Sequence, residues 1–66
     1  MNVQAEINAR LNEVRNAKDR TSLTFMHGNA CGSINTMFRL NALPLDQWAV
    51  ANELLSNAFT NRSREL

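Results

Sequence analysis

Apolar and polar residues alternate with the period of an α-helix in two long stretches of this chain. In the first, apolar residues recur every three or four positions, at Val3, Ile7, Leu11, Val14 and Ala17. This spacing is typical of an amphipathic helix with one buried face. Asn2 is a good N-cap for it, and Glu6–Arg10 and Arg15–Asp19 are spaced to pair across one turn. We expect a helix from about residue 3 to 18 that runs on to His27.

The second stretch, residues 43–59, is the longest apolar-rich segment and contains the only Trp and the only Pro. Pro44 suits the first turn of a helix, because its φ is fixed and it has no N–H. The sequence predicts a helix over about 44–60, followed by a polar tail, 61–66, that we expect to fray. At 100° per residue, the apolar arc of this helix is roughly twice the ~100° stripe of an ordinary surface helix. One neighbour cannot cover that arc, so we expect the helix to be central or shared with a second subunit.

Residues 19–32 fit two interpretations. Thr21–Phe25 alternates weakly, as a strand would, and Gly28-Asn29 suits a hairpin turn, but Met26 breaks the period. We prefer a helix through 21–27 that ends at Gly28 in a left-handed C-cap, followed by a loop over 29–32. Ser33 would then cap a short helix over about 33–42, which Pro44 stops.

The length of 66 residues allows a single domain, 1–66, and a chain of this size is marginally stable alone. The single cysteine excludes an internal disulfide, which leaves oligomerisation as the means of adding stability. We therefore predict an all-α fold, a helical hairpin with a short connecting helix, paired into a homodimeric bundle. The interface candidates are the large apolar side chains and the last helix's apolar face: Phe38, Trp48, Ala51, Leu55 and Phe59.

The charge pattern narrows the class of partner. A formal net charge of +1 gives little support for a nucleic-acid-binding surface. There is no apolar run of about 18 residues that could span a membrane, and the polar N-terminus lacks the core of a signal peptide. We expect a cytoplasmic protein with a reduced thiol. Ten residues are Asn, an excess that the pattern does not explain.

His27 and Cys31 are the candidates for metal or catalytic chemistry. In a symmetric dimer they could supply two His and two Cys to a tetrahedral zinc ion, and within one chain a base and a nucleophile. Neither a third orienting group nor a pair of carboxylates accompanies them in the sequence. The simpler interpretation is a histidine in a last helical turn and a small apolar cysteine. We expect no metal, no cofactor and no enzymatic activity.

Residues 32–41 resemble the recognition helix of repressor-type helix-turn-helix domains, in which a Gly turn precedes Ser, Thr and Arg. The turn lacks one residue, and Arg39 is the only basic residue in 33–42. A capped core helix is our preferred interpretation. A DNA-binding regulator that uses residues 33–41 is the alternative.

Taken whole, the chain resembles the small all-helical early-region proteins of lambdoid phages, encoded between the exonuclease and excisionase genes. The shared features are the length, the richness in Asn, Arg in excess of Lys, the amphipathic segment 3–11 and the Pro-led segment 43–48. The resemblance implies a non-enzymatic protein that modulates host functions during lytic development. It therefore implies a host protein as partner and the host cytoplasm as location. No residue role can be transferred, since no motif aligns. The expected function is a small non-catalytic protein-interaction module.

Overall fold

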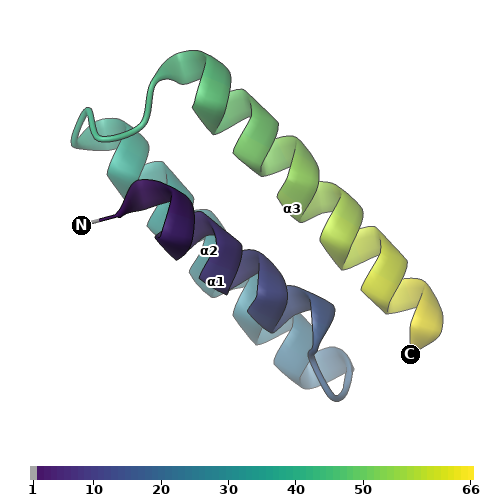
Figure 1. Cartoon of the computed structure of the whole chain (residues 1–66). Coiled ribbons are helices and arrows are strands. Elements are labelled where there is room, and N and C mark those ends of the chain that lie inside the picture. The colour runs from purple at the N-terminus through teal and green to yellow at the C-terminus, as the bar shows by residue number, and fades with distance from the viewer. Residues whose placement is uncertain (1) are drawn as a thin grey trace.

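The computed structural model describes residues 2–66, which form three α-helices (Figure 1): α1 (Val3–Arg15), α2 (Arg20–Arg39) and α3 (Leu45–Glu65). α2 runs antiparallel to the other two, so α1 and α3 are parallel and the N- and C-termini lie at opposite ends of the bundle (Figure 1). Each helix packs against both others. The all-α prediction is confirmed. The strand interpretation of residues 21–25 is wrong, because this segment is helical.

The predicted arrangement of the helices is wrong in its details. The first helix does not run from 3 to 27, and no short connecting helix covers 33–42. Instead α1 ends at Arg15, and a single 20-residue helix, α2, spans both segments. The molecule is therefore a three-helix bundle rather than a two-helix hairpin with a connector.

The break between α1 and α2 is made by two capping residues. The Asn16 side-chain amide donates to the carbonyl of Asn12 at 2.8 Å, which closes the last turn of α1. The Asp19 carboxylate accepts from the backbone N–H of Ser22 at 2.7 Å and so caps the start of α2. Asp19 thus serves as a cap, not as the predicted i,i+4 partner of Arg15, whereas the predicted Glu6–Arg10 pair is present at 2.8 Å.

α2 passes through both glycines without interruption. Gly28 is helical and has no positive φ, so the predicted C-cap there and the loop over 29–32 are wrong. The helix instead ends after Arg39, where Asn41 takes a φ of 60°. The Ala42 N–H bonds the Met37 carbonyl at 2.9 Å and the Asn41 N–H bonds the Phe38 carbonyl at 3.1 Å. This pair of bonds is the Schellman arrangement that ends many helices.

α3 begins directly after Pro44, as predicted, and continues to Glu65. The expected frayed tail is helical, and Arg62 anchors it. The Arg62 guanidinium donates through Nε at 2.8 Å and Nη2 at 2.6 Å to the carbonyl of Ala17, in the α1–α2 connection. The last turns of α3 therefore hold the loop at that end of the bundle.

The core runs along the bundle axis and draws on all three helices. Its buried members are Ile7, Leu11, Val14, Ala17, Leu23, Ala30, Ile34, Met37, Leu43, Ala51, Leu55 and Ala58. Two neighbours, α1 and α2, now share the wide apolar arc of α3. The arc is thus largely covered within one chain, and the inference that α3 needs a second subunit for this purpose no longer follows.

Candidate functional site

Two of the five interface candidates lie in the core. Ala51 is 3% exposed and Leu55 is 1% exposed, so both side chains pack mainly within this chain. Sequence periodicity places both correctly on the apolar face of α3. It does not tell a face that meets another helix of the same chain from a face that meets a partner.

The three aromatic candidates fill the seam between α2 and α3. The rings of Phe38 and Trp48 stack with centroids 4.9 Å apart, and the Trp48 indole Nε1 donates to Asn35 Oδ1 at 2.9 Å. Phe59 packs on the ring of His27 at 4.4 Å. All three aromatics are half-buried by these contacts within the chain. These three rings hold α2 and α3 together, and only the exposed part of each ring is available for contact with a partner.

His27 and Cys31 lie one turn apart on α2, with His27 Nε2 3.8 Å from Cys31 Sγ. The imidazole has the phenyl ring of Phe59 on its face, and a phenyl ring cannot orient a catalytic base. Within residues 2–66 no group of three or more His, Cys, Asp and Glu side chains is placed to hold a metal ion. His27 lies in the middle of α2 and not in a last helical turn as predicted, and Cys31 beside it is half-buried.

The helix-turn-helix resemblance fails on geometry. A helix-turn-helix needs a turn between its two helices, and the glycine that would form it, Gly32, is inside α2. Ser33 is likewise in mid-helix and caps nothing. Residues 33–39 are the second half of one long helix.

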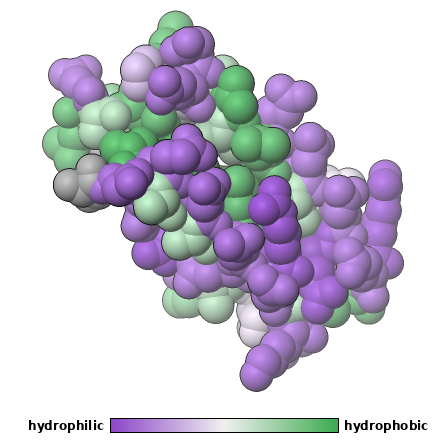
Figure 2. Space-filling view, viewed as in Figure 1, coloured by the Kyte–Doolittle hydropathy of each residue, from purple (hydrophilic) through white to green (hydrophobic). Residues whose placement is uncertain are grey.

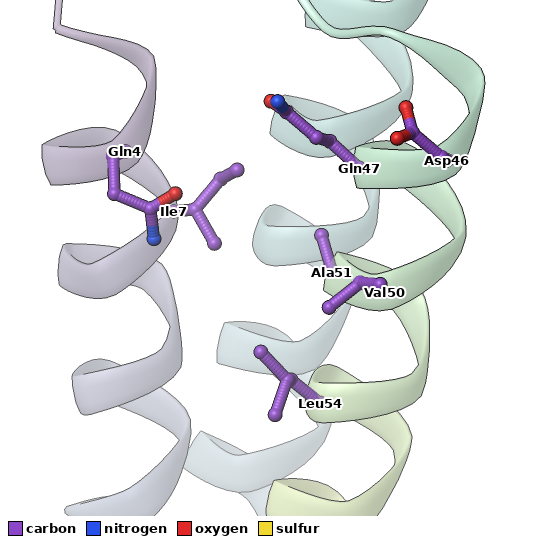
Figure 3. A pocket seen from close by; sticks show the side chains of 7 residues that line it. All are labelled: Gln4, Ile7, Asp46, Gln47, Val50, Ala51 and Leu54. Atoms are coloured by element: carbon purple, nitrogen blue, oxygen red, sulfur yellow. The ribbon is translucent and has the colours of Figure 1, made fainter.

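Two of the exposed apolar side chains, Val50 and Leu54, border the groove between α1 and α3. At the N-terminal ends of these helices the groove widens into a hollow of ≈ 190 Å³. Its lining residues come from both helices: Gln4, Ile7, Asp46, Gln47, Val50, Ala51 and Leu54. Figure 3 shows Ile7 of α1 facing Ala51 and Leu54 of α3 across the gap, with Gln47 and Asp46 at its upper end. We call this region the upper groove.

Val50 and Leu54 form the exposed apolar rim of the upper groove. Val50 is 56% exposed and Leu54 is 40% exposed, although both belong to a helix whose core side is already filled. The hydropathy surface agrees, because hydrophobic residues gather over the upper half of the molecule, and the opposite end is mainly hydrophilic (Figure 2). The chain therefore presents a concave apolar surface with two amides, Gln4 and Gln47, and one carboxylate, Asp46, in its lining.

Towards the C-terminal ends of α1 and α3 the lining of the groove becomes polar and charged. A second hollow of ≈ 310 Å³ is lined by Arg15, Ala58, Asn61, Arg62 and Glu65. The Arg62 guanidinium donates to the Ala17 carbonyl and also pairs with Glu65 at 3.0 Å, whereas Arg15 is exposed. We call this region the lower groove. The α1–α3 groove thus has an apolar end and an arginine-lined end.

Other exposed apolar side chains lie away from this groove. Phe25 is on the outer face of α2, Leu40 lies at the end of α2 and Leu45 starts α3. Leu40 lines a hollow between α1 and α2 together with Met37 and Ala42. None of these three residues lines either part of the α1–α3 groove.

Sequence reasoning missed the rim because it sorted α3 into one apolar arc and one polar strip. Val50 falls between Asn57 and Asn61 on a helical wheel, so it is an apolar residue within the polar strip. An apolar side chain in that position was the available signal. Val50 becomes part of a groove because Ile7 lies on the facing helix. Only the packing of α1 against α3 brings these two residues together.

Comparison with models of protein families, with curated proteins and with solved structures finds no match for this chain. None of the helices within residues 2–66 combines the length and the hydropathy that crossing a membrane requires. The α1–α3 groove is therefore the feature of this chain from which a function can be inferred.

Proposed function

We propose that this chain is a small non-catalytic protein-interaction module that pairs with a second copy of itself and presents the assembly to another protein. The observation that carries the proposal is the upper groove, where Val50 and Leu54 expose apolar surface above Ile7. Concave apolar surfaces rimmed by polar residues mark interaction sites in soluble proteins. The groove is also formed by two long helices, which gives a rigid surface that binding need not order.

The chemistry of the groove favours binding over catalysis. The upper groove is lined by aliphatic side chains, two amides and a single carboxylate, Asp46, which has no second titratable side chain beside it in the lining (Figure 3). The reactive pair His27–Cys31 is on α2, outside both parts of the groove. Burial of apolar area is the main driving force that such a surface can offer.

A DNA-binding role, the alternative from the sequence, gains no support from the arrangement of residues 33–41. Arg39 is the only basic side chain of that segment, and non-specific affinity for DNA grows with the number of phosphates neutralised. We keep the protein partner as the proposal. We extend it, on the sequence resemblance to lambdoid phage early proteins alone, to a host protein in the host cytoplasm.

Sedimentation equilibrium tests the proposal. We expect the wild-type chain to form dimers at micromolar concentration, and the double variant Val50→Ser/Leu54→Ser to stay monomeric with unchanged helical circular dichroism. Phe25→Ser is the matched control, because it removes an exposed apolar side chain from another face. A wild-type chain that stays monomeric at hundreds of micromolar would refute the self-pairing. Equal weakening by Phe25→Ser would show that the groove is not the interface.

A further inference from the structure

We infer that the occupant of the α1–α3 groove is the same groove of a second copy, with α3 lying antiparallel to the partner's α3 about a two-fold axis. This inference rests on the self-pairing proposed above and adds its orientation and register. Val50 of each chain packs on the partner's Leu54, and Asp46 of each chain lies over the partner's lower groove, beside the partner's Arg15.

The first argument is the register that the apolar residues impose. Exposed apolar side chains gain most when they meet each other, which places Val50 opposite the partner's Leu54. In an antiparallel pair of α3 helices, the two-fold axis then crosses the interface at the height of residue 52, midway between 50 and 54. Residues equally far on either side of 52 face one another, so Asp46 comes to lie opposite the partner's Ala58. Ala58 lines the lower groove together with Arg15 and Asn61.

The second argument is charge complementarity. The register derived from the apolar contacts alone brings the carboxylate of Asp46 to the partner's lower groove, twice in a symmetric dimer. That hollow holds two arginines and one carboxylate, Glu65. Arg62 pairs with Glu65, which leaves Arg15 as the cation that faces Asp46. Gln47 falls opposite the partner's Asn57, which pairs amide with amide. A parallel arrangement would place Asp46 beside the partner's Asp46 and Arg15 beside the partner's Arg15. Like charges across an interface disfavour that alternative.

The third argument is the area available. A stable interface of standard size buries about 800 Å² on each partner. That is about a fifth of the 4421 Å² surface of this chain, whose dimensions are 35 × 18 × 16 Å. One long side of a three-helix bundle supplies such an area. The α1–α3 groove extends along that side from Gln4 and Asp46 to Arg15 and Glu65.

Disulfide trapping tests the orientation. In a Cys31→Ser background, the variants Val50→Cys and Leu54→Cys are oxidised separately and as a mixture. We expect the mixture to form the mixed disulfide at least tenfold faster than either variant forms its own, since facing Cα atoms in the inferred register fall within disulfide range. Ser56→Cys, which is exposed outside both hollows, gives the rate of random collision.

Each outcome of the trapping decides something different. Self-disulfides that form faster than the mixed one, in a chain that dimerises, would overturn the antiparallel register and leave the interaction module standing. Rates equal to that of Ser56→Cys in a dimerising chain would place the interface elsewhere. A chain that does not dimerise at all removes the proposed self-pairing together with the register.

A charge exchange provides an independent readout. We expect Asp46→Arg to raise the dimer dissociation constant about fivefold, the size expected for partly exposed ion pairs. Arg15→Glu should do the same, and the double variant should recover the wild-type value. Asp46 and Arg15 lie at opposite ends of one chain, at the start of α3 and the end of α1, so no contact within the monomer can produce the rescue. Additive weakening in the double variant would contradict the inferred contact.

Discussion

Four of the ten asparagines in this chain lie where a helix begins, ends or meets another. Asn2 caps α1, Asn16 closes its last turn, and Asn41 takes the left-handed conformation after α2. Two further asparagines hold Trp48, since Asn35 accepts from its indole N–H and Asn52 donates to its carbonyl. Asn2, Asn16 and Asn52 use the short amide to bond nearby backbone, so part of the excess seen in the sequence has local causes.

The two glycines of α2 permit a direct test at the scale of single residues. A Cβ built on Gly28 or Gly32 meets nothing within 4 Å, and neither glycine has a positive φ. We expect Gly28→Ala and Gly32→Ala each to raise the free energy of unfolding by about 1 kcal/mol, the difference in helix propensity. Urea denaturation measures this. Ala9→Gly, at an exposed position in α1, is the control and should lower the value by a similar amount.

The N-cap of α2 predicts a dependence of stability on pH. Hydrogen bonding from the Ser22 N–H lowers the pKa of Asp19 in the folded chain. A carboxyl group with a lowered pKa contributes stability above its unfolded pKa, near 4, and loses it as the pH falls through the folded value. Asp19→Asn keeps an acceptor at this position without the charge. We expect the wild type to be more stable than Asp19→Asn at neutral pH. In thermal melts at a series of pH values, a gap that does not shrink below pH 4 would contradict this role.

At the scale of elements, the junctions decide the topology. α1 ends because Asn16 and Asp19 offer the backbone other partners, and α2 continues through two glycines because its buried face is well filled. That face carries Leu23, Ala30, Ile34 and Met37, all buried in the core. Packing on two neighbouring helices outweighs the roughly 1 kcal/mol that each glycine costs.

The anchor between α3 and the α1–α2 connection leads to a prediction for the last turns of the chain. Arg62 donates twice to the Ala17 carbonyl, and Arg64 is exposed. We expect Arg62→Ala to lower the free energy of unfolding by about 1–2 kcal/mol, since hydrogen bonds from charged donors contribute that much. Arg64→Ala should change it by less than about 0.5 kcal/mol, as surface substitutions usually do. Chemical denaturation of the two variants compares them, and equal losses would rule out a specific anchor.

At the scale of the whole molecule, the bundle separates residues that hold one chain together from residues available to a second. Leu55 and Leu54 are neighbours in sequence, yet Leu55 is 1% exposed and Leu54 is 40% exposed. The first packs against the other two helices, and the second borders the upper groove. Two adjacent residues of α3 thus serve different purposes, because Leu55 stabilises the fold and Leu54 belongs to the proposed interface.

Substitutions at this pair should separate folding from association. Leu55→Ala should lower the free energy of unfolding by about 2–5 kcal/mol, because it opens a cavity in the core. Leu54→Ala should change the unfolding of the monomer by less than about 1 kcal/mol and weaken dimer formation instead. Denaturation at a concentration well below the dimer dissociation constant isolates the first effect, and sedimentation measures the second. A large loss of monomer stability in Leu54→Ala would place this side chain in the core.

The sequence by itself determined what depends on local periodicity and local chemistry. The helical class, the N-cap at Asn2, the Glu6–Arg10 pair, the start of α3 after Pro44 and the apolar face with Ala51 and Leu55 follow from neighbouring residues alone. Such features are set by contacts three or four positions apart, which a sequence displays directly.

Only the tertiary structure decided where α1 ends, that α2 is continuous, and which apolar residues remain exposed. A glycine ends a helix or lies within one according to the free energy of packing on other helices, which no local pattern contains. Val50 becomes part of a groove because Ile7, 43 positions earlier, lies across from it. The candidate site arises from that distant juxtaposition, whereas Trp48, Phe38 and Phe59, the conspicuous side chains of the sequence, are used to join α2 to α3.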